Sequence, residues 1–299
     1  MDKKKNILTV FTPTYNRAEL LVRGYEALCR QTSKDFLWLI IDDGSKDNTR
    51  EVVEQWQKAD NGFEIQYAYK ENGGLHTGYN KAIEMMDTEI CVCIDSDDWM
   101  PDDAVEIILD SWENYKEQGI AGMVGYDYTK NGKRLGDQMQ EGKIRHYVAL
   151  KEDKRYCFDN KVVMRVDLLK SVAPQPSYYG EKNFNPIWMI LKIDQCLPFV
   201  LLDKTLCIVD YQADGMAANI INQYFNSPNS FLELRKLYVS LKYTSLRWKI
   251  RHHIHLISQS LVAGKNAFKE TPNVIVTFIF YPLGFALFKY MNYLHRKEK

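Results

Sequence analysis

The sequence predicts an α/β fold, with a mainly parallel sheet flanked by helices and a helical C-terminal extension. Over residues 6–110, short apolar runs alternate four times with segments of helical hydrophobic spacing. This alternation is typical of parallel strands joined by helical crossovers. Near residue 230 the composition changes, and basic amphipathic segments suited to helices follow.

Each expected strand is a short apolar run bounded by turn-forming residues, and each expected helix has an apolar stripe. The strands are expected in residues 6–16, 35–45, 63–74 and 89–98, and the helices that follow them in residues 18–31, 49–59, 76–86 and 102–112. Beyond residue 120 the pattern is looser. It predicts a hairpin turning at Asn131–Gly132, a strand entering a helix over 161–172, a helix over 185–194 and a late strand over 196–211.

Four polar segments follow the first four expected strands. They read TPTYNR (12–17), DDGS (42–45), KENGG (70–74) and DSDD (95–98). Ligands of open parallel sheets bind at the carboxyl ends of the strands. We therefore expect all four segments to converge on one crevice.

Charge is divided unevenly along the 299 residues, whose 45% hydrophobic content is that of an ordinary folded chain. Residues 235–299 contain 12 Lys and Arg against two acidic residues, whereas the rest of the chain contains 27 against 37. We therefore expect one domain over residues 1–230 and, over 231–299, basic helices with an anionic partner. A membrane surface fits that partner. Nucleic acid does not, because nothing upstream resembles a reader of bases.

The cysteines and the N-terminus indicate a cytoplasmic protein. The six cysteines are scattered, and Cys91 and Cys93 alternate along one expected strand without the His or second Cys pair of a zinc site. The first residues, MDKKKNILTV, enter a strand at once and do not read as a signal peptide. We therefore expect reduced thiols.

Five aspartates lie within residues 95–103, directly after the fourth expected strand. Asp102 and Asp103 open a helix, where acidic side chains interact favourably with the helix dipole. Asp95, Asp97 and Asp98 would repel one another unless a positive group lies among them or water screens them. A solvated turn is the simpler explanation, but we expect a cation site.

The four motifs, in this order and at strand ends, resemble the family 2 glycosyltransferases of GT-A (Rossmann-like) fold. The resemblance is close over about residues 6–110 and looser to about residue 230. It implies a nucleotide-binding half over 1–110, an acceptor-binding half over 111–230, and inverting transfer of a sugar. The donor it implies is a nucleotide-sugar, expected to be UDP-linked. The acceptor is a surface glycan or a polyprenyl-linked glycan, as in capsule synthesis.

The resemblance also implies roles for single residues. Asp95 would face the ribose or the metal, Asp97 would bind the metal, and Asp98 would support them. The metal would be Mg²⁺ or Mn²⁺, since hard cations prefer carboxylate oxygens. Tyr15 would stack on the base, and Asp43 would accept a hydrogen bond from uracil N3.

The remaining donor contacts are expected in the same loops. Pro13 and Thr14 would shape the turn, and the other expected contacts are Asn16, Arg17, Gly74, His76, Asn80 and Ser96. His76 or Lys70 could donate to phosphate, although Leu75 stands where many relatives carry a basic residue. Without the resemblance, Asp43 is equally explained by a tight turn, Arg17 by a surface position and His76 by burial.

An inverting transfer needs a base that takes the acceptor proton. Relatives place this acid in the region that reads YYGEKNFNPIWMILKIDQ here, so Glu181 is the first candidate and Asp194 the second. The common Glu-Asp pair is absent, and some relatives carry an acid at the position of Ile187. Asp214 and Asn219 resemble part of a loop that closes over the donor. Two alternatives stay open: a non-catalytic nucleotide-sugar-binding or membrane scaffold protein, and a nucleotidyltransferase.

The C-terminal tail predicts membrane attachment without crossing. Residues 274–288 carry no charge, and Pro282 and Gly284 are expected to interrupt them. As a helix, 15 residues extend about 22 Å, short of a hydrocarbon core of about 30 Å. We expect a peripheral or monotopic attachment to the inner face of the cytoplasmic membrane. The alternative is an amphipathic helix packed against the protein.

Overall fold

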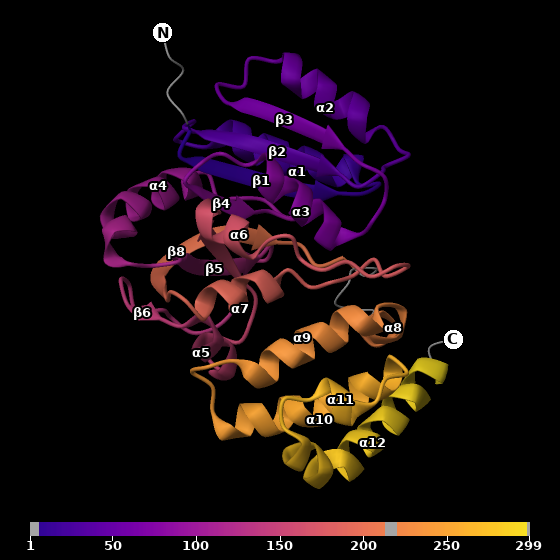
Figure 1. The fold of residues 1–299 in the computed structure, drawn as a ribbon. Coiled ribbons are helices and arrows are strands. Elements are labelled where there is room, and N and C mark those ends of the chain that lie inside the picture. The colour runs from indigo at the N-terminus through magenta and orange to yellow at the C-terminus, as the bar shows by residue number, and fades with distance from the viewer. Residues whose placement is uncertain (1–5, 213–219, 298–299) are drawn as a thin grey trace. The chain divides into compact units, whose positions relative to one another are not determined.

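The computed structural model describes residues 6–212 and 220–297 (Figure 1). The chain forms two compact units, and the first of them contains the sheet. The first unit comprises residues 1–73, 77–174 and 192–211, and the second comprises residues 74–76, 175–191 and 212–299. Residues 175–191 therefore group with the C-terminal helices in this division, and the boundary at residue 230 stays a prediction.

The first unit is built on one eight-stranded sheet with the order β3-β2-β1-β4-β7-β5-β8-β6. The strands are β1 (Leu8–Thr14), β2 (Phe36–Asp42), β3 (Glu64–Tyr69), β4 (Ile90–Cys93), β5 (Gly122–Thr129), β6 (Ile144–Arg145), β7 (Asn160–Arg165) and β8 (Phe199–Val209). Strands β6 and β7 run antiparallel to their neighbours, and the other strands are parallel. The predicted mainly parallel α/β sheet is confirmed.

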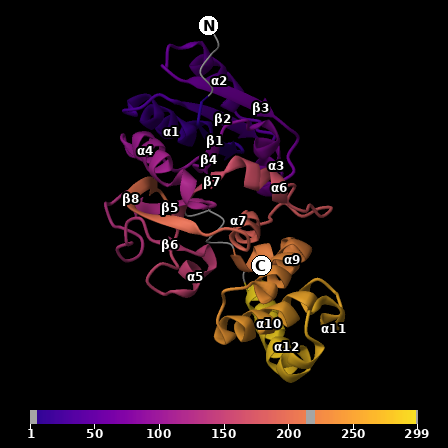
Figure 2. The ribbon, with the colours of Figure 1, turned by 60° about the vertical axis from the view of Figure 1, so that its left-hand side comes forward.

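Helices cover both faces of this sheet, so its strands β1 and β2 are buried throughout. The helices are α1 (Ala18–Arg30), α2 (Thr49–Lys58), α3 (Leu75–Met85), α4 (Ala104–Tyr115), α5 (Tyr147–Glu152), α6 (Val166–Val172) and α7 (Ile187–Asp194), with a 3₁₀ turn at Lys116–Gln118. Figure 2 shows α1 and α4 on one side of the strands and α3 and α6 on the other. Every residue of β1 and β2 is buried, as expected for parallel strands covered on both faces.

Alternate residues of β1 and β2 face the two helical layers. On one face, the ring of Trp38 lies 5.7 Å from that of Trp56, and Tyr25 stacks on Trp56 at 4.3 Å. On the other face, Phe11 meets Tyr79 of α3 edge to face at 5.0 Å. Large rings on both sides fix β1 at the centre of the core, because aromatic contacts add to the free energy of apolar burial.

The second half of the chain also follows most of the predicted elements. The strand entering a helix is β7 with α6, and the late strand is β8. The predicted turn at Asn131–Gly132 is present, with φ of +76° at Gly132 and a hydrogen bond from its N–H to the Thr129 carbonyl. The pairing after the turn is short: Tyr128 and Arg134 form an isolated bridge, and hydrogen bonds join the Thr129 N–H to the Lys133 carbonyl and the Leu135 N–H to the Asp127 carbonyl.

The second unit contains the C-terminal helices, which lie side by side in Figures 1 and 2. They are α8 (Ile220–Asn226), α9 (Pro228–Ser240), α10 (Leu246–Val262), α11 (Ala267–Glu270) and α12 (Val274–Lys297). Leu232, Val239 and Leu256 form a small apolar core between α9 and α10. The predicted helical extension is therefore present.

Helix α12 is continuous through Pro282, and the interruption that we predicted does not occur. Pro282 is exposed, so the carbonyl that it leaves unpaired can meet solvent. Gly284 serves close packing, since a Cβ at this position would lie 2.5 Å from Cβ of Ile257 on α10. The helix has 24 residues and extends about 36 Å, so length alone no longer argues against a membrane span.

Candidate active site

Pairing in the sheet brings the predicted loops together at the carboxyl ends of the strands. Strand β1 pairs with β2 on one side, up to Thr14 opposite Asp42, and with β4 on the other, up to Phe11 opposite Cys93. The segments TYNR, DDGS and DSDD therefore leave neighbouring strands at the same edge. Segment KENGG follows β3, which pairs with β2.

Asn16 joins the loop after β1 to the loop after β2. Its N–H donates to Oγ of Ser45 at 2.8 Å, and its Oδ1 accepts from the N–H of Lys46 at 2.7 Å. Its φ of +51° is a left-handed conformation that Asn adopts more readily than most residues. This junction positions the neighbouring Tyr15, whose side chain is 44% exposed and available for stacking.

Pro13 and Thr14 lie at the end of β1 and are both buried. Pro13 is part of the strand, opposite Ile41 of β2, and does not end it. Oγ1 of Thr14 is buried without a hydrogen-bond partner among the described residues. These two residues support Tyr15 from within the sheet.

Asp43 is buried and organises the loop after β3. Its carboxylate pairs with Nζ of Lys70 and accepts hydrogen bonds from the Gly73 N–H at 3.0 Å and from Nδ2 of Asn72 at 3.2 Å. Lys70, which we considered as a phosphate donor, is thus engaged by Asp43. The carboxylate that we expected at the uracil edge also holds residues 70–73 in place.

The start of α3 is packed more tightly than a phosphate-binding loop requires. Gly74 has a φ of +94°, and a Cβ there would lie 2.0 Å from the carbonyl oxygen of Lys182. His76 is fully buried, with its ring 6.3 Å from that of Phe184, and Asn80 is half-buried. Packing within the second unit therefore accounts for the glycine at position 74.

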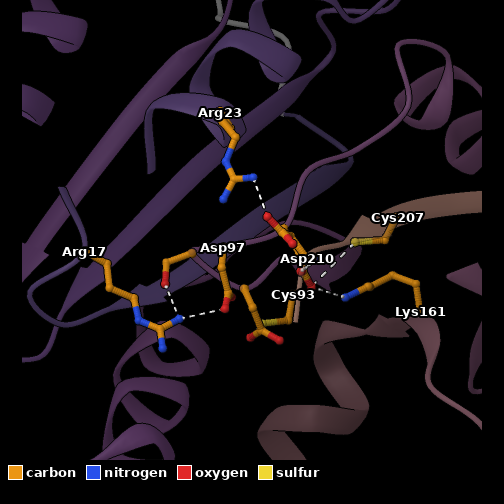
Figure 3. Close-up of polar contacts among 10 residues, drawn as sticks. Arg17, Arg23, Cys93, Asp97, Lys161, Cys207 and Asp210 are labelled. Carbon is orange, nitrogen blue, oxygen red and sulfur yellow. Dashed lines mark hydrogen bonds and ion pairs between the residues drawn. The ribbon is translucent and has the colours of Figure 1, made fainter. Parts of the chain in front are cut away.

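The three carboxylates of the acidic segment after β4 have different surroundings, and Figure 3 shows Asp97 beside Arg17. Asp95 is exposed, whereas Ser96 is buried. Asp97 pairs with Nη1 of Arg17 at 2.9 Å, and the same nitrogen lies 3.5 Å from Oγ of Ser96. Asp98 is buried, and burial raises its pKa to about 7.

Asp98 is contacted by residues that the sequence analysis missed. Its Oδ2 lies 3.9 Å from Nζ of Lys161 on β7, and its Oδ1 accepts from the N–H of Asp210 at 3.2 Å. Asp210 in turn pairs with Arg23 at 2.7 Å and with Lys130 at 2.6 Å. The signal in the sequence was Lys161 itself, a charged residue directly before the apolar run at residues 162–164.

Asp127 on β5 is a second residue that the sequence analysis missed. It is 2% exposed, and its Oδ1 has no hydrogen-bond partner among the described residues. Burial raises its pKa to about 6, while Lys161 opposes that shift. An aspartate within the strand GMVGYDYT was the available signal.

The donor set suits a cation that is shared with a substrate. Among the described residues, no group of three His, Cys, Asp or Glu side chains is arranged to hold a metal ion. Asp95 and Asp97 nevertheless supply two carboxylates at the sheet edge, and Mg²⁺ is typically bound by one or two carboxylates together with substrate phosphates and water. The residues therefore fit a divalent cation that binds with a diphosphate.

Both carboxylates that we predicted as the base cap helices. Glu181 is buried and caps α9: Oε1 accepts from the Asn229 N–H at 2.9 Å, and Oε2 accepts from the Ser230 N–H and hydroxyl at 2.8 and 2.7 Å. Asp194 is fully buried and caps α5, accepting from the N–H groups of Tyr147 and Val148 at 2.6 and 3.1 Å. These positions argue against either carboxylate as the proton acceptor. Asp214 and Asn219 lie outside the described residues.

Comparison with known proteins identifies the family and the fold of the chain. The family model "Glycosyl transferase family 2" matches residues 9–172, which include every loop of the β1–β4 edge. The chain belongs to this family. The solved structure of S. aureus TarS 1-349 in complex with UDP-GlcNAc has a TM-score of 0.63 at 16% identity, covering 94% of this chain and 80% of that one. A mannosyltransferase from Pyrobaculum calidifontis in complex with GDP-Man and Mn²⁺ has a TM-score of 0.56 at 15% identity, covering 96% of this chain and 82% of that one.

Curated relatives of this family 2 member match about a third to a half of its length. Chondroitin synthase of Escherichia coli is 28% identical over 140 residues, 47% of this chain and 20% of that protein. The putative glycosyltransferase EpsH of Bacillus subtilis is 29% identical over 164 residues, 53% of this chain and 47% of that protein. The putative teichuronic acid biosynthesis glycosyltransferase TuaG, also of Bacillus subtilis, is 30% identical over 106 residues, 36% of this chain and 42% of that protein. The matches thus span less than half of these relatives.

Replacing Glu181 should affect folding rather than chemistry. We expect Glu181→Gln to lower the free energy of unfolding by about 1–3 kcal/mol, because four hydrogen bonds at the start of α9 lose their charged acceptor. Denaturant unfolding of this variant and of the exposed control Glu26→Gln measures the difference. A drop in turnover of a hundredfold or more at unchanged stability would instead make Glu181 the base.

Asp127→Asn should stabilise the fold in a pH-dependent way. The pKa of Asp127 is raised from 3.8 to about 6, so its protonated form favours the folded state, and this contribution is lost as pH rises through 6. The variant should gain about 1–3 kcal/mol over the natural chain at pH 8 and much less at pH 4. Thermal unfolding at both pH values measures this. If Asp127→Asn were less stable than the natural chain by the same amount at pH 4 and pH 8, this prediction would be contradicted.

Proposed function

We propose that this chain is an inverting, divalent-cation-dependent glycosyltransferase. It transfers a sugar from a UDP-sugar to a glycan or polyprenyl-linked acceptor in surface polysaccharide biosynthesis. The observation that carries the proposal is one sheet edge that presents the exposed ring of Tyr15 next to the carboxylates of Asp95 and Asp97. The UDP-GlcNAc complex of TarS supports the donor class, and the teichuronic acid relative supports the pathway class.

The residues at this edge divide the work on the donor. Tyr15 stacks on the base, and Asp43 offers a carboxylate to its edge from a loop that Asn16 keeps in position. A bound Mg²⁺ or Mn²⁺, held by Asp95 and Asp97, would offset the charge that develops on the departing diphosphate. Lys161 and the Asp210 N–H keep Asp98, and with it the turn of the acidic segment, in a single arrangement.

A second candidate function is a nucleotide-sugar-binding protein without turnover. The observation that favours it is the capping role of both Glu181 and Asp194, which leaves neither carboxylate available to an acceptor hydroxyl. Release of UDP from a donor panel separates the two candidates. A nucleotidyltransferase, which uses similar acid clusters, would instead release pyrophosphate from a nucleoside triphosphate.

Helix α12 supports a peripheral attachment to the inner face of the cytoplasmic membrane. Its apolar residues are unusually exposed: Val274, Ile275, Phe278, Ile279 and Leu283 are each 55–73% exposed. By length and composition the helix could cross a membrane, and only 11% of its most apolar 18-residue stretch is buried within the protein.

Its packing favours lying on the surface over crossing. Thr277 and Gly284 face α10, which carries Arg247 and Arg251, and a crossing helix would draw these charges into the bilayer. The basic end of α12, at Arg296 and Lys297, suits anionic headgroups.

Substitutions at the sheet edge should separate nucleotide binding from turnover. We expect Tyr15→Ala to weaken UDP affinity about tenfold while Tyr15→Phe retains it, because stacking needs only the ring. We expect Asp97→Asn to fold normally and lose about a hundredfold in cation-dependent UDP release. Calorimetry and a UDP-release assay measure these effects. If Tyr15→Ala kept the UDP affinity of the natural chain and Asp97→Asn kept its rate of UDP release, the donor would have to bind elsewhere.

Membrane binding should depend on the exposed face of α12. In flotation with anionic vesicles, we expect Phe278→Glu to lose about tenfold or more in the bound fraction, since it replaces an exposed ring that would insert into the membrane by a charge. Phe158→Glu is the matched control, because Phe158 is 50% exposed in the first unit. Binding by the natural chain should fall with salt. Equal flotation of both variants would contradict the proposal.

A further inference from the structure

Arg17 is the cation that neutralises Asp97 in this structure. Its Nη1 lies 2.9 Å from Oδ2 of Asp97 and 3.5 Å from Oγ of Ser96 (Figure 3). The side chain of Arg17 is 31% exposed and that of Asp97 is 16% exposed, so the pair is partly shielded from water. The charge that the acidic segment needs is therefore already supplied by the chain itself.

The two neighbouring partnered carboxylates are held differently. Asp98 is buried between Nζ of Lys161 and the N–H of Asp210. Asp210 has two cations, Arg23 and Lys130. Asp97, in contrast, forms one ion pair among the described residues, to the partly exposed side chain of Arg17. Of the three, it is the carboxylate whose counter-ion can leave without unpacking the core.

The backbone at Arg17 and Ala18 is held by hydrogen bonds that do not involve the Arg17 side chain. Its carbonyl accepts from the N–H groups of Leu20 and Leu21 at the start of α1. The next N–H, that of Ala18, donates to Oδ2 of Asp47 at 3.0 Å. Exchange of the guanidinium therefore requires rotation of the side chain and leaves the loop that carries Tyr15 in place.

We propose that Arg17 is an exchangeable counter-ion, which holds Asp97 before the donor binds and moves to the donor's diphosphate when a divalent cation takes Asp97. This inference rests on the proposed function, since it requires a cation and a diphosphate at the same edge. A guanidinium and a divalent cation on one carboxylate repel each other. A guanidinium also pairs well with phosphate oxygens, so it gains a new partner as it leaves.

The exchange makes cation and nucleotide binding interdependent. Without nucleotide, the cation must displace Arg17 from Asp97 and leave the guanidinium without a partner. With a nucleoside diphosphate present, the displaced guanidinium is paired again. Arg17 should therefore oppose binding of the cation alone and favour binding of the two together, which is a positive coupling between the two ligands.

Binding measured without turnover tests this on the full chain. We expect Arg17→Gln to bind Mn²⁺ alone about two- to fivefold more tightly than the natural chain, because removing a partly exposed ion pair frees Asp97. The same variant should bind UDP more weakly, and Mn²⁺ should improve its UDP affinity less. Electron paramagnetic resonance of free Mn²⁺ and calorimetry with UDP give the constants.

Two variants control for charge and for folding. Arg30→Gln removes one positive charge from the same helix, where Arg30 pairs with Asp102 at 3.1 Å, and it should leave Mn²⁺ affinity within experimental error. Arg17→Lys keeps the charge and should keep the weak binding of Mn²⁺ alone. The inference would be overturned if Arg17→Gln bound Mn²⁺ no more tightly than the natural chain. It would also be overturned if Arg30→Gln showed the same increase in Mn²⁺ affinity as Arg17→Gln. If the natural chain binds UDP with Mn²⁺ in that case, the proposed function stands. If it binds neither, both fail.

Discussion

The central position of β1 in the first unit is the constraint on which the candidate site depends. Because β1 pairs in parallel with β2 and with β4, the loops that follow these three strands must emerge at one edge. Its rings and aliphatic side chains are buried on both faces, so a shift in register would expose core residues. The position of Tyr15 relative to Asp43 and Asp95 is therefore set by the same burial that stabilises the sheet.

The carboxylates concentrated at this edge repel one another, and positive and donor groups elsewhere in the first unit offset that repulsion. Lys161 from β7 and the end of β8 restrain Asp98, and Arg17 from the loop after β1 balances Asp97. Asp95 is left exposed. The negative charge is therefore offset to different degrees: Asp98 lies near a buried lysine, Asp97 pairs with a partly exposed arginine, and Asp95 is exposed to solvent. A cation entering from solvent thus meets the least compensated position first, which is the order that a site loaded together with its substrate requires.

How far the sequence predicted this arrangement depended on the range of the interactions involved. The alternation of strands and helices and the convergence of four polar loops follow from local pattern and parallel topology, and both could be predicted. The capping of α9 by Glu181 could not, because its partners Asn229 and Ser230 lie nearly fifty residues away. Likewise Pro282 signalled a break, but Gly284 packs against Ile257, and that contact with α10 lies outside any local pattern.

The same limit explains why acidity alone is a poor guide to catalytic residues in this fold. Glu181, Asp194 and Asp98 are all buried acids, yet the first two accept backbone N–H groups at helix starts. Such a carboxylate would have to give up its cap to take a proton from a substrate. Asp97 differs in kind, because its partner is a side chain that can turn away while the backbone stays fixed. What distinguishes a binding carboxylate here is thus the ease with which its partner is exchanged, and that property becomes visible only when the distant strands are brought to one edge.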